Sequence, residues 1–192
     1  AYWLEAGLDG RGPYDNMEQR PFAERCILSF SSTAGPPMMP ALYNNHKRIV
    51  QTEDTVVILV EMVHDARVVR MNAEHDPPEI QKWLGDSIGW WEDDTLVVET
   101  THFNAKLDGG DYQPSHVTPT GPRGSGETLT VVERFALTAA NTIDYQVTVE
   151  DPETFAVPYT AAIPMQRSAG DGLLYTSDAA DDTPCVEHHG RS

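Results

Sequence analysis

The stretch ETLTVVERFALTAANTIDYQVTVE, residues Glu127–Glu150, decides the fold class of this chain. In its second half Ile143, Tyr145, Val147 and Val149 alternate with polar residues. Because successive side chains of a β-strand point to opposite faces, this alternation indicates a strand with one buried and one solvated face. The first half is a second β-rich run, and a short connection separates the two. The stretch therefore predicts an antiparallel hairpin.

Strand patterns continue on both sides of this hairpin. A second hairpin is expected from Asp86–Trp91 and Thr95–Phe103 around an acidic turn, and His64–Met71 is expected to continue Thr55–Val63 past a bend. The other expected strands are Glu24–Ser31, Arg48–Thr52 and Thr154–Ile163. Short strands in succession, without helical crossovers, predict an all-β domain. We expect an antiparallel meander closed into a lipocalin-like barrel, with a β-sandwich or jelly roll as the alternative.

The chain of 192 residues is long enough for one domain. We expect an extended N-terminal arm over residues 1–23, a β-barrel domain over 24–165, and a non-native or disordered tail over 166–192. Within that tail Leu173–Asp182 reads codon for codon as a translated sequencing adapter. No function is therefore placed on the tail residues Cys185, His188 and His189.

The composition excludes several classes of partner. The formal charge is −17, from 30 acidic and 13 basic residues. Phosphate backbones and anionic lipids repel such a surface, so no nucleic-acid partner is expected. No apolar run approaches the roughly 20 residues that a membrane span needs, so no membrane insertion is expected. The expected partner is a small molecule, and a flat edge strand near Pro158 leaves a homodimer open.

Cys26 has two interpretations that the residues alone leave open. It is either a small buried hydrophobic residue or half of a disulfide bond. The chain also begins at Ala1 without a Met, which indicates a trimmed N-terminus from which a signal peptide has been removed.

Several motifs carry a resemblance over roughly Pro21–Met165. They are RIVQT at 48–52, EMVHDAR at 61–67, WLGDSIGWWE at 83–92, DTLVVETT at 94–101, VERF at 132–135 and TVEDP at 148–152. Together they resemble a large family of exported, β-rich bacterial proteins from soil and marine genomes. The resemblance implies a periplasmic or secreted location and a natural tail with another cysteine, which favours a disulfide to Cys26. It implies no established activity.

The motif from Glu61 to Arg67 places four titratable side chains beside an apolar strand. On a straight strand Glu61, Asp65 and Arg67 share one face, and His64 lies on the other. We expect burial there to raise the pKa of Glu61, as a general acid or base requires, and we expect Asp65 and Arg67 to form an orienting ion pair. The alternative is a salt bridge between Asp65 and Arg67 at the rim, with Glu61 paired to an Arg of a neighbouring strand.

Glu133 is the second candidate because it falls in register with apolar residues of its strand. A buried carboxylate is costly unless it is paired or hydrogen-bonded. Glu133 and Glu61 are expected either as an acid and a base with separated pKa values, or as part of a structural network across the core. Tyr145, on the inner face of the next strand, is a hydrogen-bonding partner in both interpretations.

Histidines near strand ends form a third group: His64, His75, His102 and His116. His102 is expected on the inward face that continues Thr100. Together with Glu61 or Asp65 these side chains suit zinc, but their spacing matches no compact ligand motif. A metal-dependent site is therefore kept as an alternative, and the prediction includes no metal or other cofactor.

These patterns predict a small exported enzyme that uses acid–base chemistry on a small apolar or aromatic molecule. The reaction would be of the lyase, hydratase, isomerase or hydrolase type. The expected catalytic residues are Glu61, His64, Asp65, Arg67 and Glu133, and the expected substrate-binding residues are Tyr145, Trp90, Trp91 and His102. The alternative is a non-catalytic, lipocalin-like protein that binds a small hydrophobic ligand.

Overall fold

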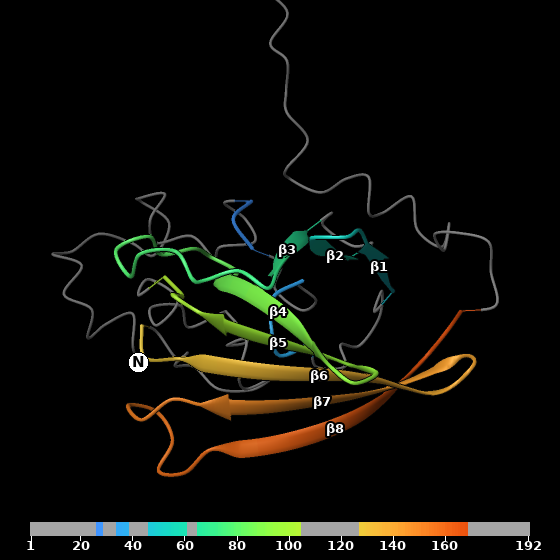
Figure 1. The fold of residues 1–192 in the computed structure, drawn as a ribbon. Coiled ribbons are helices and arrows are strands. Elements are labelled where there is room, and N and C mark those ends of the chain that lie inside the picture. The colour runs from blue at the N-terminus through green and yellow to red at the C-terminus, as the bar shows by residue number, and fades with distance from the viewer. Residues whose placement is uncertain (1–25, 29–33, 39–45, 61–64, 105–126, 169–192) are drawn as a thin grey trace, which may run out of the picture.

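The computed structural model describes residues 26–28, 34–38, 46–60, 65–104 and 127–168 (Figure 1). This part of the chain forms eight strands and no helix. The strands are β1 (Lys47–Gln51), β2 (Thr55–Val60), β3 (Ala66–Met71), β4 (Asp86–Glu92), β5 (Thr95–Thr101), β6 (Thr130–Ala139), β7 (Thr142–Glu150) and β8 (Tyr159–Gln166). The predicted all-β class is confirmed.

All eight strands belong to one sheet, in the order in which they occur in the chain. The sheet curls into an open half-barrel, with β1–β3 folded over the longer strands β5–β8 (Figure 1). Every neighbouring pair is antiparallel except β3 and β4, which run parallel. The strands β1 and β8 are the two edges of the described sheet, so closure into a barrel is not observed.

Both predicted hairpins are present. Strands β6 and β7 pair from Thr130 opposite Glu150 to Ala139 opposite Thr142, with a bulge near the turn. Strands β4 and β5 pair around the turn that contains Asp93, which adopts a left-handed backbone with φ 52°. Short hairpin turns favour such a conformation because it matches the twist of the flanking strands. The alternation expected for β7 is confirmed, since Tyr145, Val147 and Val149 are all buried.

The prediction that His64–Met71 continues the preceding strand is wrong. β2 ends at Val60, and the chain returns antiparallel as β3, with the Val60 amide donating to the Asp65 carbonyl at 2.9 Å. This reversal lets the two runs pair with each other and turn their buried positions to the same interior. Glu61 and His64 lie outside the described residues.

Other predicted segments meet the structure only in part. Within the expected strand Glu24–Ser31, the described residues 26–28 form a turn and a bend. Cys26 is exposed and disulfide-bonded, so its interpretation as a buried hydrophobic residue is wrong; the other half of the bond lies outside the described residues. The N-terminal arm and most of the tail also lie outside them. The described residues contain no helix long and apolar enough to cross a membrane.

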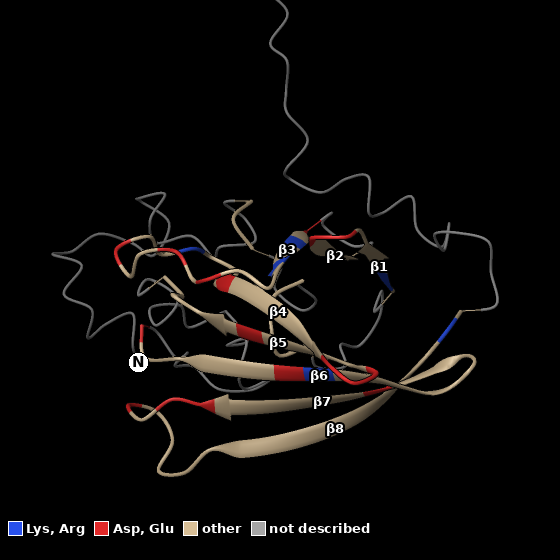
Figure 2. Ribbon diagram, viewed as in Figure 1, with Lys and Arg blue, Asp and Glu red and all other residues tan. Residues whose placement is uncertain are grey.

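The concave face of the sheet carries the hydrophobic core. Its buried strand residues come from β2, β3, β5, β6 and β7 and include Val56, Ile58, Val69, Val98, Val131, Phe135, Tyr145 and Val147. Acidic residues are spread over β4, β5, β6 and β7 rather than gathered in one patch (Figure 2). Two of the acidic residues on these strands, Asp86 and Glu133, are buried.

The parallel contact between β3 and β4 is short. Residues 72–85, called the crossover below, lead from the end of β3 to the start of β4. Only Val69–Met71 pairs with Ser87–Gly89. The first half of β3 therefore has no partner on the β4 side in the described sheet. This separation positions the candidate site.

Candidate functional site: a cavity between β3 and β4

A buried ion pair crosses the concave interior. Two guanidinium nitrogens of Arg67 lie 2.5 and 3.0 Å from the two carboxylate oxygens of Glu133. Their side chains are 1% and 0% exposed, so the pair is shielded from water. Arg67 also approaches Thr100 Oγ1 at 3.5 Å, and Thr100 shares a 2.8 Å hydrogen bond with Ser87. The expected network across the core is present.

Tyr145 extends this network. Its hydroxyl donates to Glu133 Oε1 at 2.9 Å and accepts from the Met38 amide at 2.9 Å. Burial and the Glu133 carboxylate raise the pKa of Tyr145, which keeps the hydroxyl protonated as a donor. On β1, burial and the nearby Arg67 lower the pKa of Lys47. Glu133 is thus held by a cation and a hydroxyl.

A cavity of about 440 Å³ opens where β3 and β4 separate. One wall is the start of β3 and the other is the end of the crossover with the start of β4. The apolar part of its lining includes Ile27, Leu28, Trp83 and Leu84; the charged part is Asp65, Arg67, Arg70, Lys82 and Asp86. The volume falls within the range of small-molecule sites, which is roughly 300–1,000 Å³.

Two residues of this lining have buried polar atoms without a hydrogen-bonding partner among the described residues. These atoms are Asp65 Oδ2 and Arg67 Nε. Burial raises the pKa of Asp65 to about 6, because desolvation disfavours the charged carboxylate. The predicted ion pair between Asp65 and Arg67 is not formed, because Arg67 pairs with Glu133 instead. Asp65 is therefore suited to exchange a proton near neutral pH.

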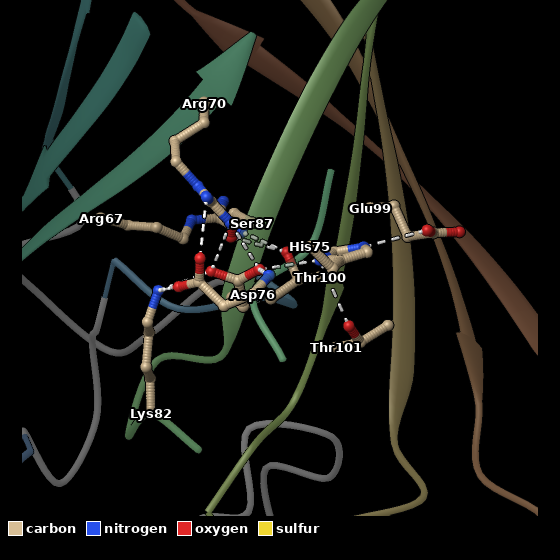
Figure 3. Close-up of polar contacts among 10 residues, drawn as sticks. Arg67, Arg70, His75, Asp76, Lys82, Ser87, Glu99, Thr100 and Thr101 are labelled. Carbon is tan, nitrogen blue, oxygen red and sulfur yellow. Dashed lines mark hydrogen bonds and ion pairs between the residues drawn. The ribbon is translucent and has the colours of Figure 1, made fainter. Parts of the chain in front are cut away.

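The Asp86 carboxylate organises a second, more polar cluster. Figure 3 labels its neighbours Arg70, Asp76 and Lys82. Asp86 accepts hydrogen bonds from Arg70 at 2.8 and 3.0 Å, from Lys82 at 2.6 Å and from the Asp76 amide at 3.0 Å. Asp76 binds Arg70 and Lys82 in turn. Burial acts to raise the pKa of Asp86, but these donors and His75 outweigh it and hold that pKa well below its usual range. The cluster fastens the crossover to the start of β4.

His75 links Asp86 to β5. Its Nδ1 lies 2.9 Å from Asp86 Oδ2 and its Nε2 lies 3.1 Å from Glu99 Oε1, as Figure 3 shows for the Glu99 side. The ring of His102 stands edge-on to His75, with centroids 5.4 Å apart. His102 has a left-handed backbone with φ 53°, which breaks the alternation of β5. The prediction that His102 continues the inward face of Thr100 is therefore wrong, because it lies beside His75 and Asp86.

The structure brings some predicted site residues together and separates others. Asp65 and Arg67 line the cavity, and Glu133 and Tyr145 reach it only through Arg67. Trp90 donates to Glu92 near the β4–β5 turn, and the neighbouring Trp91 is 46% exposed; neither is among the described residues that line the cavity. His64 and Glu61 lie outside the described residues, as does His116.

Sequence reasoning missed Arg70, Lys82, Asp86 and Trp83. The i, i+4 spacing of Lys82 and Asp86 is a weak local signal for an ion pair. The stronger determinant is the parallel pairing of β3 with β4, which brings Arg70 to Asp86. No local pattern indicated that pairing.

Comparison with protein-family models, curated proteins and solved structures finds no match for this chain.

Proposed function

We propose that the chain binds a small amphipathic molecule in the cavity between β3 and β4, and that Asp65 acts on it as a general acid or base. The observation that carries the proposal is a pair of buried atoms on the lining of one cavity, Asp65 Oδ2 and Arg67 Nε. Neither has a hydrogen-bonding partner among the described residues. Leaving a buried polar atom unpaired costs about 1–3 kcal/mol. A bound carbonyl or carboxylate oxygen that accepts from Arg67 Nε would remove that cost.

The chemistry of the lining supports a ligand with an apolar body and an electronegative head. Three basic and two acidic residues line the cavity in a chain whose formal charge is −17. Trp83 and Leu84 provide apolar contact on one wall. Protonated Asp65 donates a hydrogen bond and ionised Asp65 accepts one, so a pKa of about 6 suits proton transfer to or from a ligand at neutral pH. Arg67 would stabilise negative charge that develops on the ligand.

The predicted mechanism with two carboxyl groups, Glu61 and Glu133, receives less support than one based on Asp65. Both oxygens of Glu133 are engaged by Arg67 and one also by Tyr145. These contacts favour the alternative interpretation of Glu133, in which it belongs to a structural network across the core. The small molecule would then bind in the cavity without direct action by Glu133. Closure into a lipocalin-like barrel remains a proposal, and the cavity does not depend on it.

Export to the periplasm or medium is also part of the proposal. It rests on the resemblance of the motifs within Pro21–Met165 to a family of exported proteins.

The test uses aromatic carboxylates and their neutral amides as probes, with binding followed by calorimetry and turnover by NMR. We compare wild type, Asp65→Asn and the control Asp94→Asn, which changes an exposed turn residue. The expected result is carboxylate binding by all three proteins, with turnover reduced at least about 100-fold only in Asp65→Asn. Binding without turnover in wild type would support the binding protein instead. No binding of any probe would contradict the proposal.

A further inference from the structure

His75, Asp86 and His102 form a group that is separate from the proposed action of Asp65. One ligand atom from each lies within 4.8 Å of those of the other two. They come from three places in the fold: the crossover, the start of β4 and the residue after β5. Two imidazoles and a carboxylate are a donor set that suits zinc and related divalent metals.

The hydrogen bonds of His75 leave one of its nitrogens for a cation. Its Nδ1 and Nε2 both face carboxylate oxygens, of Asp86 at 2.9 Å and Glu99 at 3.1 Å. An ionised carboxylate only accepts, so a proton or a cation must lie at each nitrogen. With a proton on Nε2 donated to Glu99, Nδ1 presents its lone pair to a metal shared with Asp86, and such a metal would replace the 3.4 Å contact of Nδ1 with Thr101 Oγ1. A ligating histidine commonly donates its second N–H to a carboxylate in this way.

His102 supplies an independent observation. Its Nδ1 is buried and has no hydrogen-bonding partner in the part of the chain that the structure describes. The left-handed φ of 53° places the residue beside His75, and the Lys82 amide holds its carbonyl at 2.9 Å. A buried imidazole nitrogen without a partner is costly unless a proton donor or a metal reaches it.

The surrounding charges permit a divalent cation. Arg70 and Lys82 both contact Asp86 and would repel a metal. They are offset by three carboxylates, those of Asp76, Asp86 and Glu99. With both histidines neutral, the acidic groups of the cluster outnumber the basic ones by one.

We propose that His75, Asp86 and His102 form a binding site for a divalent transition metal of the zinc class, with Glu99 orienting His75. Metal there would join the crossover, β4 and the end of β5 at one point. The site borders the cavity through Asp86 and does not depend on the proposed chemistry of Asp65.

The test titrates the full chain, after dialysis against a chelator, with Zn²⁺ by calorimetry and with Co²⁺ by visible absorption. The variants are His75→Gln, His102→Gln and Glu99→Gln, with His46→Gln as a matched control outside the cluster. Wild type and His46→Gln are expected to bind one equivalent. Affinity is expected to fall at least about 100-fold in the two ligand variants and about 10-fold in Glu99→Gln, with unchanged far-UV circular dichroism.

Two results would overturn the proposal. One is no binding by wild type. The other is binding that persists in both His75→Gln and His102→Gln, which would place the metal on other histidines of the chain. Should the ligand variants lose their folded spectrum, Glu99→Gln decides: unchanged affinity in that variant contradicts the proposed orientation of His75.

Discussion

Arg67 on β3 and Glu133 on β6 are 66 residues apart in the sequence and form a buried, two-pronged ion pair inside the half-barrel. Two strands, β4 and β5, lie between them in the sheet, so the contact spans the concave face. Such a contact requires the sheet to be curled. Formation of the pair therefore depends on the curvature of the sheet as well as on the two charges.

Removing one member of this pair is expected to be strongly destabilising. Arg67→Met leaves the Glu133 carboxylate buried without its cation, which costs about 3–5 kcal/mol. The double variant Arg67→Met/Glu133→Leu removes both charges and is expected to regain most of that loss. Urea unfolding of wild type, both single variants and the double variant measures the coupling. Equal losses in the single and double variants would contradict a buried pair.

The neighbouring residue on β6 provides a contrast. Arg134 contacts Glu92 on the opposite, exposed side, where the two side chains are 42% and 45% exposed. Water screens such a pair, so Arg134→Ala is expected to change the free energy of unfolding by less than about 1 kcal/mol. The same urea titration measures it. A loss as large as that of Arg67→Met would refute the assignment of the two faces of β6.

The Tyr145 hydroxyl is expected to stabilise the fold through both of its hydrogen bonds. Tyr145→Phe leaves the Met38 amide without its acceptor and Glu133 without one donor. We expect a loss of about 1–3 kcal/mol in the free energy of unfolding. Gln146→Ala, exposed on the other face of β7, serves as the control and should stay within about 0.5 kcal/mol of wild type. Indistinguishable midpoints for the two variants would contradict this role.

Asp65 is expected to make stability fall as pH rises. Its pKa is about 6 in the folded chain against 3.8 for the ordinary carboxyl, so the folded state holds the proton more tightly than the unfolded state. Its stabilising effect is complete below about pH 4 and is lost as pH rises through 6. Relative to Asp65→Asn, wild type should lose on the order of 1–2 kcal/mol between pH 4 and 8, since the carboxyl is partly exposed. A difference between the two proteins that does not vary with pH would rule out a raised pKa.

Gly85 is expected to tolerate no side chain. Its φ is 74°, and an added Cβ would lie 2.5 Å from Thr100 Cγ2 and 2.8 Å from Phe103 Cε1. Gly85→Ala therefore combines backbone strain with a clash in the wall of the cavity, and we expect a loss of about 1–3 kcal/mol. Thermal unfolding measures it. A wild-type melting temperature would show that the start of β4 is less closely packed than the structure indicates.

The sequence by itself determined the all-β class, most of the strands and both hairpins. Alternation in Thr142–Glu150 and the turn around Asp93 are local properties, since strand faces follow from a two-residue period and turns from a few residues. The same alternation placed Glu133 and Tyr145 on the interior face. Local patterns also marked Asp65 and Arg67 as charged residues beside an apolar strand. They did not indicate with which charged group either side chain pairs.

Only the tertiary structure decided how those residues combine. Whether Asp65–Arg67 or Arg67–Glu133 forms the ion pair depends on the curl of the sheet, which no local period encodes. The cavity and the Asp86 cluster depend on the parallel pairing of β3 with β4 across residues 72–85. His102 does not lie on its expected face, because its own left-handed backbone interrupts the two-residue alternation of side chains that β5 would otherwise continue. Contacts between distant segments follow from the register and curvature of the sheet, and these emerge only when all the strands pack together.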